Sequence, residues 1–222
     1  QSSDNTGIES SCPRIRIVND ISNPSSLYGF YLNTSDTSGA DCQMLLISAT
    51  PEKQVADPGA TVTYTVTVQN GGNGPEELSL SVAKLEVNWK LKYVMGNAEI
   101  TDIYLDPASP LSFEVVVTVP PDALCGDHIA AISLLDSSKA PWTADLVINV
   151  RHIFDIDLTT TLSKQLGTPG RTLYFSVLTK NKGNGLDTIS FATSKLPSGW
   201  TYVYKDQEFA TVDSITLNAS DI

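Results

Sequence analysis

Apolar and polar residues alternate along much of this chain, most regularly between residues 61 and 68. Threonines there separate four apolar residues: Val62, Tyr64, Val66 and Val68. A period of two is typical of a β-strand with one buried and one solvated face, and the branched Cβ of threonine suits the solvated face. Similar patterns predict strands at 14–18, 44–47, 78–82, 89–93, 111–119, 128–134 and 145–150. No stretch shows a convincing helical period, so we expect an all-β protein.

An internal repeat organises the chain. Residues 57–93 align without a gap with residues 168–204 at an offset of 111, and 13 of the 37 positions are identical. The shared positions include a Pro-Gly pair, an Asn-x-Gly-Asn-Gly motif and one tryptophan in each copy. A period of roughly 110 residues matches one Ig-like β-sandwich. The sequence therefore predicts tandem Ig-like β-sandwiches.

Both terminal repeats are incomplete in this sequence. The second copy ends before any counterpart of the strand at 111–119, whereas the segment 1–50 resembles the second half of a repeat. That weak match compares Arg14–Val18 with Val115–Val119, Gly29 with Gly126, and Met44–Ile47 with residues 146–150. Three domains are therefore predicted: an N-terminal half-repeat or donor of strands (1–50), a complete Ig-like sandwich (51–152) and a second, truncated sandwich (153–222).

A half-sandwich with an open apolar face and unpaired edges is not expected to be stable alone. A longer array of repeats could have been cut, or residues 1–50 could fold back within their own chain. Alternatively, the N-terminal half of one subunit (about 12–50) completes the open half (about 154–222) of the next by strand addition. Head-to-tail contacts of this kind, if they do not close, generate filaments.

These motifs resemble a known group of Ig-like repeats. The resemblance is carried by Pro-Gly before an alternating strand, Asn-x-Gly-Asn, Leu-Pro-x-Gly-Trp at 196–200 and Val-x-Val-Pro-Pro-Asp-Ala-x-x-Gly-Asp at 117–127. They are similar to the α-galactosidase-associated and cell-adhesion-related domains of bacterial and archaeal surface proteins. The resemblance covers about 51–204, although residues 85–89 depart from the Leu-Pro-x-Gly-Trp pattern. It implies a tandem, extracellular setting and carries no catalytic residue to this chain.

Charge and cysteine content narrow the setting further. The net charge of -11 argues against nucleic acid and anionic membranes as partners, and no apolar run is long enough to span a bilayer. Three cysteines cannot all pair within one chain. We expect either a Cys12–Cys42 disulfide that leaves Cys125 over, or three unrelated thiols. Asn33 and Asn218 each begin an N-glycosylation acceptor triplet. Together these features favour an extracellular location.

Candidate catalytic and ligand-binding residues are few. His128 lies in a predicted strand and His152 near a repeat junction, and neither has a cysteine at zinc-ligand spacing. Asp155 and Asp157 could contribute to a calcium site, but a solvated strand edge explains them better. Core packing likewise explains Trp142 better than sugar stacking does. A Lys–Asn or Lys–Asp isopeptide bond is chemically possible, and the sequence does not identify the pair.

The sequence therefore favours a non-enzymatic structural subunit, or a segment of one, in a surface filament or surface layer, with no cofactor. Its expected partners are copies of itself, head-to-tail, or neighbouring repeats of a longer chain. The alternative is a carbohydrate-binding or adhesion module, or an accessory domain of a secreted glycosidase.

Overall fold

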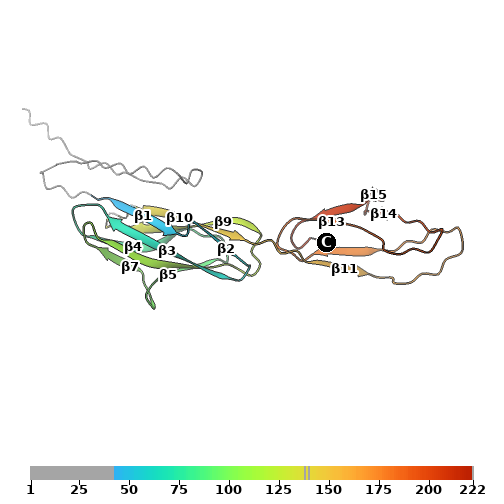
Figure 1. Ribbon diagram of the computed structural model, residues 1–222, viewed down its shortest axis with the longest axis horizontal. Helices are drawn as coiled ribbons and strands as arrows, with labels where there is room; N and C mark the ends of the chain where they lie inside the picture. Colours follow the sequence, from blue (N-terminus) through green and yellow to red (C-terminus); the bar gives the residue numbers. More distant parts are fainter. Residues whose placement is uncertain (1–42, 138, 140, 222) are drawn as a thin grey trace, which may run out of the picture. The chain divides into compact units, whose positions relative to one another are not determined.

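The computed structural model describes residues 43–137, 139 and 141–221, and in them the chain is all-β, as predicted (Figure 1). None of these residues belongs to a helix long and apolar enough to cross a membrane. The chain divides into two compact units. The described parts of the first are 43–56, 60–120 and 127–149, and those of the second are 57–59, 121–126 and 150–221.

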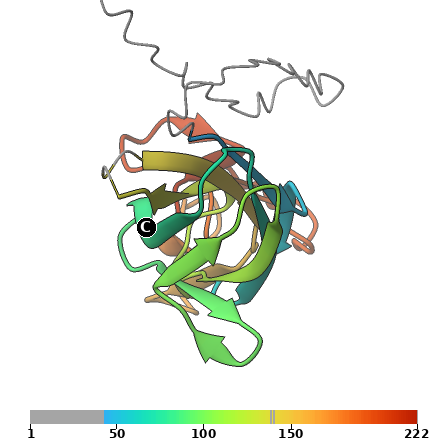
Figure 2. The ribbon, with the colours of Figure 1, turned by 90° about the vertical axis from the view of Figure 1, so that its left-hand side faces the viewer.

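Two five-stranded sheets form the first unit, with the strand orders β1-β3-β8-β5-β6 and β2-β10-β9-β4-β7. The strands are Leu45–Thr50 (β1), Lys53–Ala56 (β2), Thr61–Asn70 (β3), Glu76–Lys84 (β4), Lys90–Met95 (β5), Ala98–Glu99 (β6), Asp102–Leu105 (β7), Pro110–Thr118 (β8), Gly126–Leu135 (β9) and Pro141–Val150 (β10). Figure 2 shows these strands arranged around a common interior. The arrangement is consistent with a β-sandwich.

Strand β3 shows how the alternating sequence becomes a core. Its apolar residues are buried, whereas Thr61, Thr63 and Thr65 face solvent. Within its sheet β3 pairs with β8, which places Val66 beside Phe113. The Tyr64 hydroxyl donates a hydrogen bond of 2.5 Å to the carbonyl of Val147 in β10. Because β3 and β10 belong to different sheets, this bond ties the two sheets together across the core.

The edge strand β1 pairs with β3 along its whole length, from Leu45 opposite Asn70 to Thr50 opposite Thr65. The sequence comparison matched Met44–Ile47 with residues of β10 and grouped them with the half-repeat 1–50. The structure instead makes β1 a strand of the first unit. Strand pairing is non-local, so alternation within the segment did not identify its partner. Residues 1–42 of the predicted half-repeat lie outside the described residues.

The second unit contains six shorter strands in three two-stranded sheets, β11-β12, β13-β16 and β14-β15. They are Ile156–Thr160 (β11), Val177–Asn181 (β12), Asp187–Ser190 (β13), Tyr204–Lys205 (β14), Thr211–Val212 (β15) and Ser214–Leu217 (β16). The pair β11-β12 repeats the pair β1-β3: Ile156 lies opposite Asn181 as Leu45 lies opposite Asn70. The repeat offset found in the sequence therefore holds between these two strand pairs.

The Asn-x-Gly-Asn-Gly turn is built in the same way in both units. The Asn70 side chain accepts a hydrogen bond from Gly72 N–H (2.8 Å) and donates to the carbonyls of Gly74 (2.7 Å) and Leu105 (3.2 Å). The Asn181 side chain makes the three matching bonds, at 2.8, 2.8 and 3.1 Å. Both asparagines are fully buried.

The segment 85–89, which departs from the Leu-Pro-x-Gly-Trp pattern, keeps the turn. Asn88 has a φ of 68° where Gly199 has a φ of 84°. Asparagine is one of the few non-glycine residues that tolerate this left-handed conformation. In both units the backbone N–H of the tryptophan also donates to the backbone carbonyl three residues earlier, at 3.3 Å for Trp89 and 3.2 Å for Trp200.

Candidate functional site

Matched positions of the two units differ sharply in their exposure to solvent. Tyr64 is fully buried, whereas its counterpart Phe175 is 49% exposed. Val66 is fully buried, whereas Val177 is 59% exposed. The tryptophans differ in the same way: Trp89 and Trp142 are each 8% exposed, whereas Trp200 is 59% exposed. Core packing, which the sequence favoured for Trp142, is confirmed.

The first unit shows what covers these positions. The ring of Tyr93 packs edge-on against Phe113 of β8, with ring centroids 6.0 Å apart. The indole of Trp89 packs against His128 of β9 at 5.1 Å. Counterparts of β8 and β9, at the offset of 111, would begin at about residue 221, where this sequence ends. The side chains that would cover Tyr204 and Trp200 are therefore missing from the described second unit.

Strand β12 is shorter than its counterpart β3, because the pairing that β8 provides has no equivalent in the described second unit. In the first unit, Thr61–Tyr64 are paired with β8 and lie beyond the reach of β1, which pairs with residues 65–70. Their counterparts, residues 172–175, form no strand. Strand β12 accordingly has five residues where β3 has ten.

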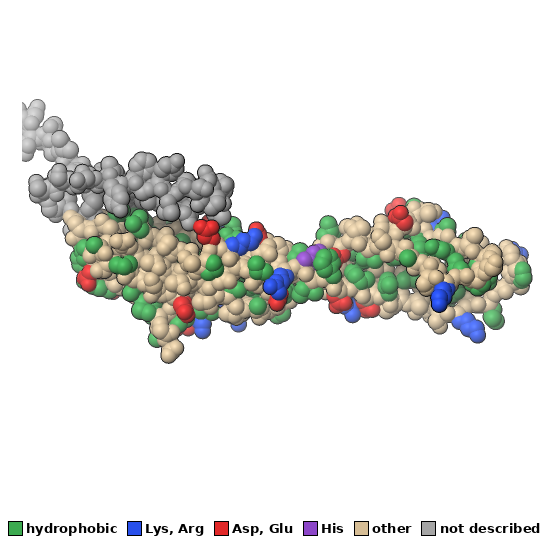
Figure 3. Space-filling view, in the orientation of Figure 1, with side chains coloured by type: hydrophobic (Ala, Val, Ile, Leu, Met, Phe, Trp, Pro, Cys, Tyr) green, Lys and Arg blue, Asp and Glu red, His purple; other side chains and the backbone are tan. Residues whose placement is uncertain are grey.

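The result is an apolar surface on the second unit, which we call the open face: Phe175, Val177, Trp200, Tyr202 and Tyr204. Figure 3 shows hydrophobic side chains at the surface of this unit. The ring centroids of Tyr202 and Tyr204 in the open face lie 5.4 Å apart, and the ring centroid of Phe191, outside this set, lies 5.1 Å from that of Tyr204. An exposed apolar surface of this kind typically marks an interaction site.

A buried polar cluster occupies another part of the second unit. Asp187 is 6% exposed; one carboxylate oxygen lies 3.1 Å from Nε2 of His152, and the other has no hydrogen-bond partner in the described residues. A Cβ added to Gly185 would lie 2.5 Å from Cys125 Sγ and 2.8 Å from His152 Nε2, so a larger residue here would force these side chains to shift.

The contact with His152 gives the buried carboxylate of Asp187 a partner within the second unit. The same ring nitrogen, Nε2, lies beside the position that a Cβ of residue 185 would take.

The remaining predicted site residues are placed as follows. Cys12, Cys42 and Asn33 lie outside the described residues, and Cys125 is a free, half-buried thiol. Asn218 is exposed, and its side chain donates a 2.8 Å hydrogen bond to Asp221.

Asp157 forms a 3.1 Å ion pair with Lys182. Among the described residues no group of three or more His, Cys, Asp or Glu is placed to hold a metal ion. The calcium alternative raised for Asp155 and Asp157 therefore gains no further ligand.

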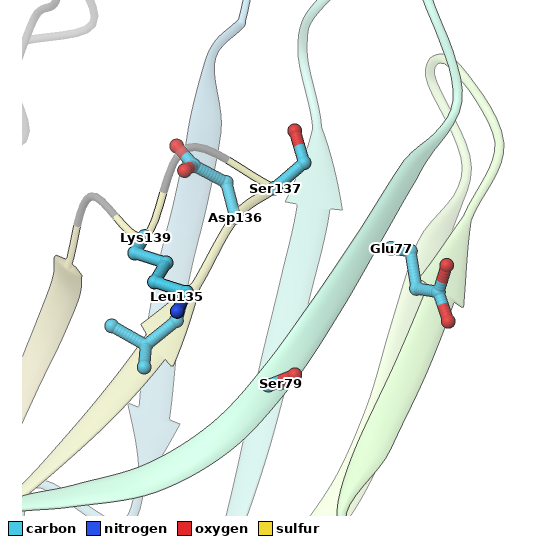
Figure 4. A pocket seen from close by; sticks show the side chains of 6 residues that line it. All are labelled: Glu77, Ser79, Leu135, Asp136, Ser137 and Lys139. Carbon is cyan, nitrogen blue, oxygen red and sulfur yellow. The ribbon is translucent and has the colours of Figure 1, made fainter.

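The first unit has a shallow hollow of about 440 Å³ lined by Glu77, Ser79, Leu135, Asp136, Ser137 and Lys139 (Figure 4). These side chains do not point toward one common position. The open face is the stronger candidate for a functional site. In the first unit the matched positions are covered by β8 and β9, and the described second unit has no such cover.

No protein-family model and no curated protein sequence matches this chain. Solved structures with some likeness include a family 123 glycoside hydrolase from Clostridium perfringens, with a TM-score of 0.38 and 11% identity over 48% of this chain and 27% of that chain. Native α2-macroglobulin from Escherichia coli gives a TM-score of 0.38 and 15% identity over 52% of this chain and 7% of that chain. The sporulation control protein Spo0M from Bacillus subtilis gives 0.36 and 14% over 67% and 75%. The chain thus spans less than a third of the first two structures, and likeness at this level identifies neither a family nor a function.

Proposed function

We propose that this chain is a non-enzymatic structural subunit, or a segment of one, in an extracellular assembly such as a surface filament or surface layer. Its units are tandem Ig-like β-sandwiches related to the cell-adhesion-related repeats of surface proteins. Copies of the chain associate head-to-tail, with strands of one copy completing the second unit of the next. The observation that carries this proposal is the open face, whose matched positions in the first unit are buried.

Burial of the open face provides the driving force. Fully burying a valine or phenylalanine side chain contributes about 1.5–3 kcal/mol. Val177 and Phe175 are each about half exposed, and Trp200 adds a large indole surface. An added strand also forms backbone hydrogen bonds along an edge that is unpaired in the described residues. Adding a strand to the second unit therefore stabilises the assembly in two ways, by burying apolar surface and by forming backbone hydrogen bonds.

Extracellular placement rests on separate features. The acceptor triplets at Asn33 and Asn218 fit a glycosylated surface protein, and Asn218 is exposed. A Cys12–Cys42 disulfide would require an oxidising compartment.

Carbohydrate binding is the second candidate, and the exposed aromatic rings favour it. Trp200 and Tyr202 are both more than half exposed, and flat rings of this kind stack on sugars. In this alternative the open face binds a glycan while the chain stays monomeric.

The test is the particle size of the undenatured chain, measured by light scattering and negative-stain imaging. We expect long, regular particles far above the 23.9 kDa of one chain. Val177→Asp should abolish them, because a carboxylate would be buried against the incoming strand. The matched control is Val87→Asp, since Val87 is 85% exposed on the first unit. A monodisperse particle of 23.9 kDa would contradict assembly, and binding of that monomer to a glycan array would favour the second candidate.

A further inference from the structure

We propose that the completing strand lies along the edges of residues 172–179 and β14, in the place that β8 takes in the first unit, and that residues 1–42 of a second copy supply it. We call these two edges the acceptor site. The inference rests on the proposed function and names the donor and its position.

The first unit provides the geometry of the acceptor site. Strand β8 lies between β3 and β5 and pairs antiparallel with both, so Val115 faces Tyr64 on one side and Tyr93 on the other. At the repeat offset of 111, the residues equivalent to Tyr64 and Tyr93 are Phe175 and Tyr204. A donor strand in the place of β8 therefore presents one apolar residue to both Phe175 and Tyr204.

One end of the acceptor site is already filled by the chain itself. Ser220 N–H donates to the carbonyl of Asn181, and Asn181 N–H donates to the carbonyl of Asp221, each at 3.0 Å. The described chain reaches no further along β12. The donor strand therefore occupies the edge from Thr179 toward residue 172 and leaves the Asn181 end to the acceptor's own chain.

The donor assignment follows from the position of residues 1–42 in the repeat period. Met44 accepts a 2.7 Å hydrogen bond from Gly71 N–H, and at the equivalent positions of the next repeat Asp155 accepts one of 2.7 Å from Lys182 N–H. The segment that ends at residue 42 therefore precedes β1 as β8, β9 and β10 precede β11. Within it, the sequence match places residues 14–18 at residues 115–119, the end of β8, so this segment carries the counterpart of the strand that the second unit lacks.

The chemistry of the donor fits the acceptor site. In residues 14–18, Ile15 and Ile17 alternate with Arg14 and Arg16. An extended strand of this sequence has an apolar face for Phe175 and Val177 and a charged face for solvent. Residues 43–50 are excluded as donor because β1 is engaged with β3.

A mixing experiment with full-length chains tests the donor and the acceptor separately. The chain Ile15→Asp/Ile17→Asp has a defective donor, and the chain Val177→Asp has a defective acceptor. Neither should assemble alone. Their mixture should form a heterodimer and nothing longer, because it contains one working donor and one working acceptor. The control Arg14→Ser/Arg16→Ser alters the solvent face of the same segment and should still form long particles.

Tryptophan fluorescence provides the second readout. Trp89 and Trp142 are each 8% exposed, so a change in emission on assembly reports mainly Trp200. We expect a blue shift and several-fold weaker acrylamide quenching in the wild-type assembly and the heterodimer, with Trp200→Phe as the reference.

The outcomes separate this inference from the proposed function. If the wild-type chain is monomeric, the proposed function and the donor assignment fail together. If the wild-type chain assembles and Ile15→Asp/Ile17→Asp assembles equally well, the donor assignment fails and the proposed function stands. If both defective chains are monomeric and the mixture stays monomeric, pairing between this donor and this acceptor site is overturned.

Discussion

Two buried asparagines, Asn70 and Asn181, hold equivalent turns through three side-chain hydrogen bonds each. Replacing Asn70 with alanine leaves Gly72 N–H and two carbonyls without these partners. Because buried polar groups without partners are costly, we expect a loss of about 2–4 kcal/mol in the free energy of unfolding of the first unit. Denaturant unfolding measures this loss. Asn70→Asp keeps the acceptor for Gly72 N–H but sets a buried carboxylate oxygen against two carbonyls, so it should cost at least as much at neutral pH. Equal stability of all three chains would contradict the assignment.

Burial raises the pKa of Tyr64 and that of Tyr93 to about 12, from 10.0 in a model compound. The unfolded chain therefore loses these protons at lower pH than the folded unit does. The stabilisation is complete below pH 10 and is lost as the pH rises through about 12. We expect the first unit to lose on the order of 2 kcal/mol per tyrosine over this range.

Urea unfolding at a series of alkaline pH values measures this dependence. Tyr64→Phe and Tyr93→Phe should each remove about half of the slope. Unchanged stability of the wild-type chain up to pH 12 would contradict tyrosine burial as the origin of the dependence.

At the scale of elements, a turn motif brings segments together that are distant in the sequence. The Asn184 side chain donates to the carbonyl of Ala123 at 3.1 Å and accepts from Ile153 N–H at 2.7 Å, so one side chain holds both segments. The Cys12–Cys42 disulfide, which lies outside the described residues, stays a prediction.

The disulfide hypothesis predicts one accessible thiol. Without reductant, alkylation of the unfolded chain should add one label, at Cys125, and reduction should expose two more. Intact mass and peptide mapping measure the labels. Three labels without reductant would contradict the disulfide and favour three unrelated thiols.

At the scale of the whole molecule, the proposed assembly would join copies that each carry a net charge of -11. Like charge opposes association at low salt and is screened within about 8 Å at physiological ionic strength. Particle size in the scattering experiment should therefore increase with salt between low and physiological concentration. An assembly held mainly by ion pairs would show the opposite trend.

The amino-acid sequence alone predicted most strands of the described residues, the glycine-rich turns and the repeat. Local periodicity in 61–68, the Asn-x-Gly-Asn-Gly motif and the constant repeat offset express these features without reference to distant residues. The alignment also predicted an incomplete second copy.

Only the tertiary structure decided which strands are neighbours and which side chains are covered. The partner of β1 is β3, and nothing within residues 44–47 distinguishes that pairing from another. Trp89 and Trp200 occupy the same position of the repeat, yet one is buried and the other exposed. The physical reason is that burial belongs to the surroundings of a side chain: Trp89 has His128 of β9 packed against it, and the described second unit has no strand in that place.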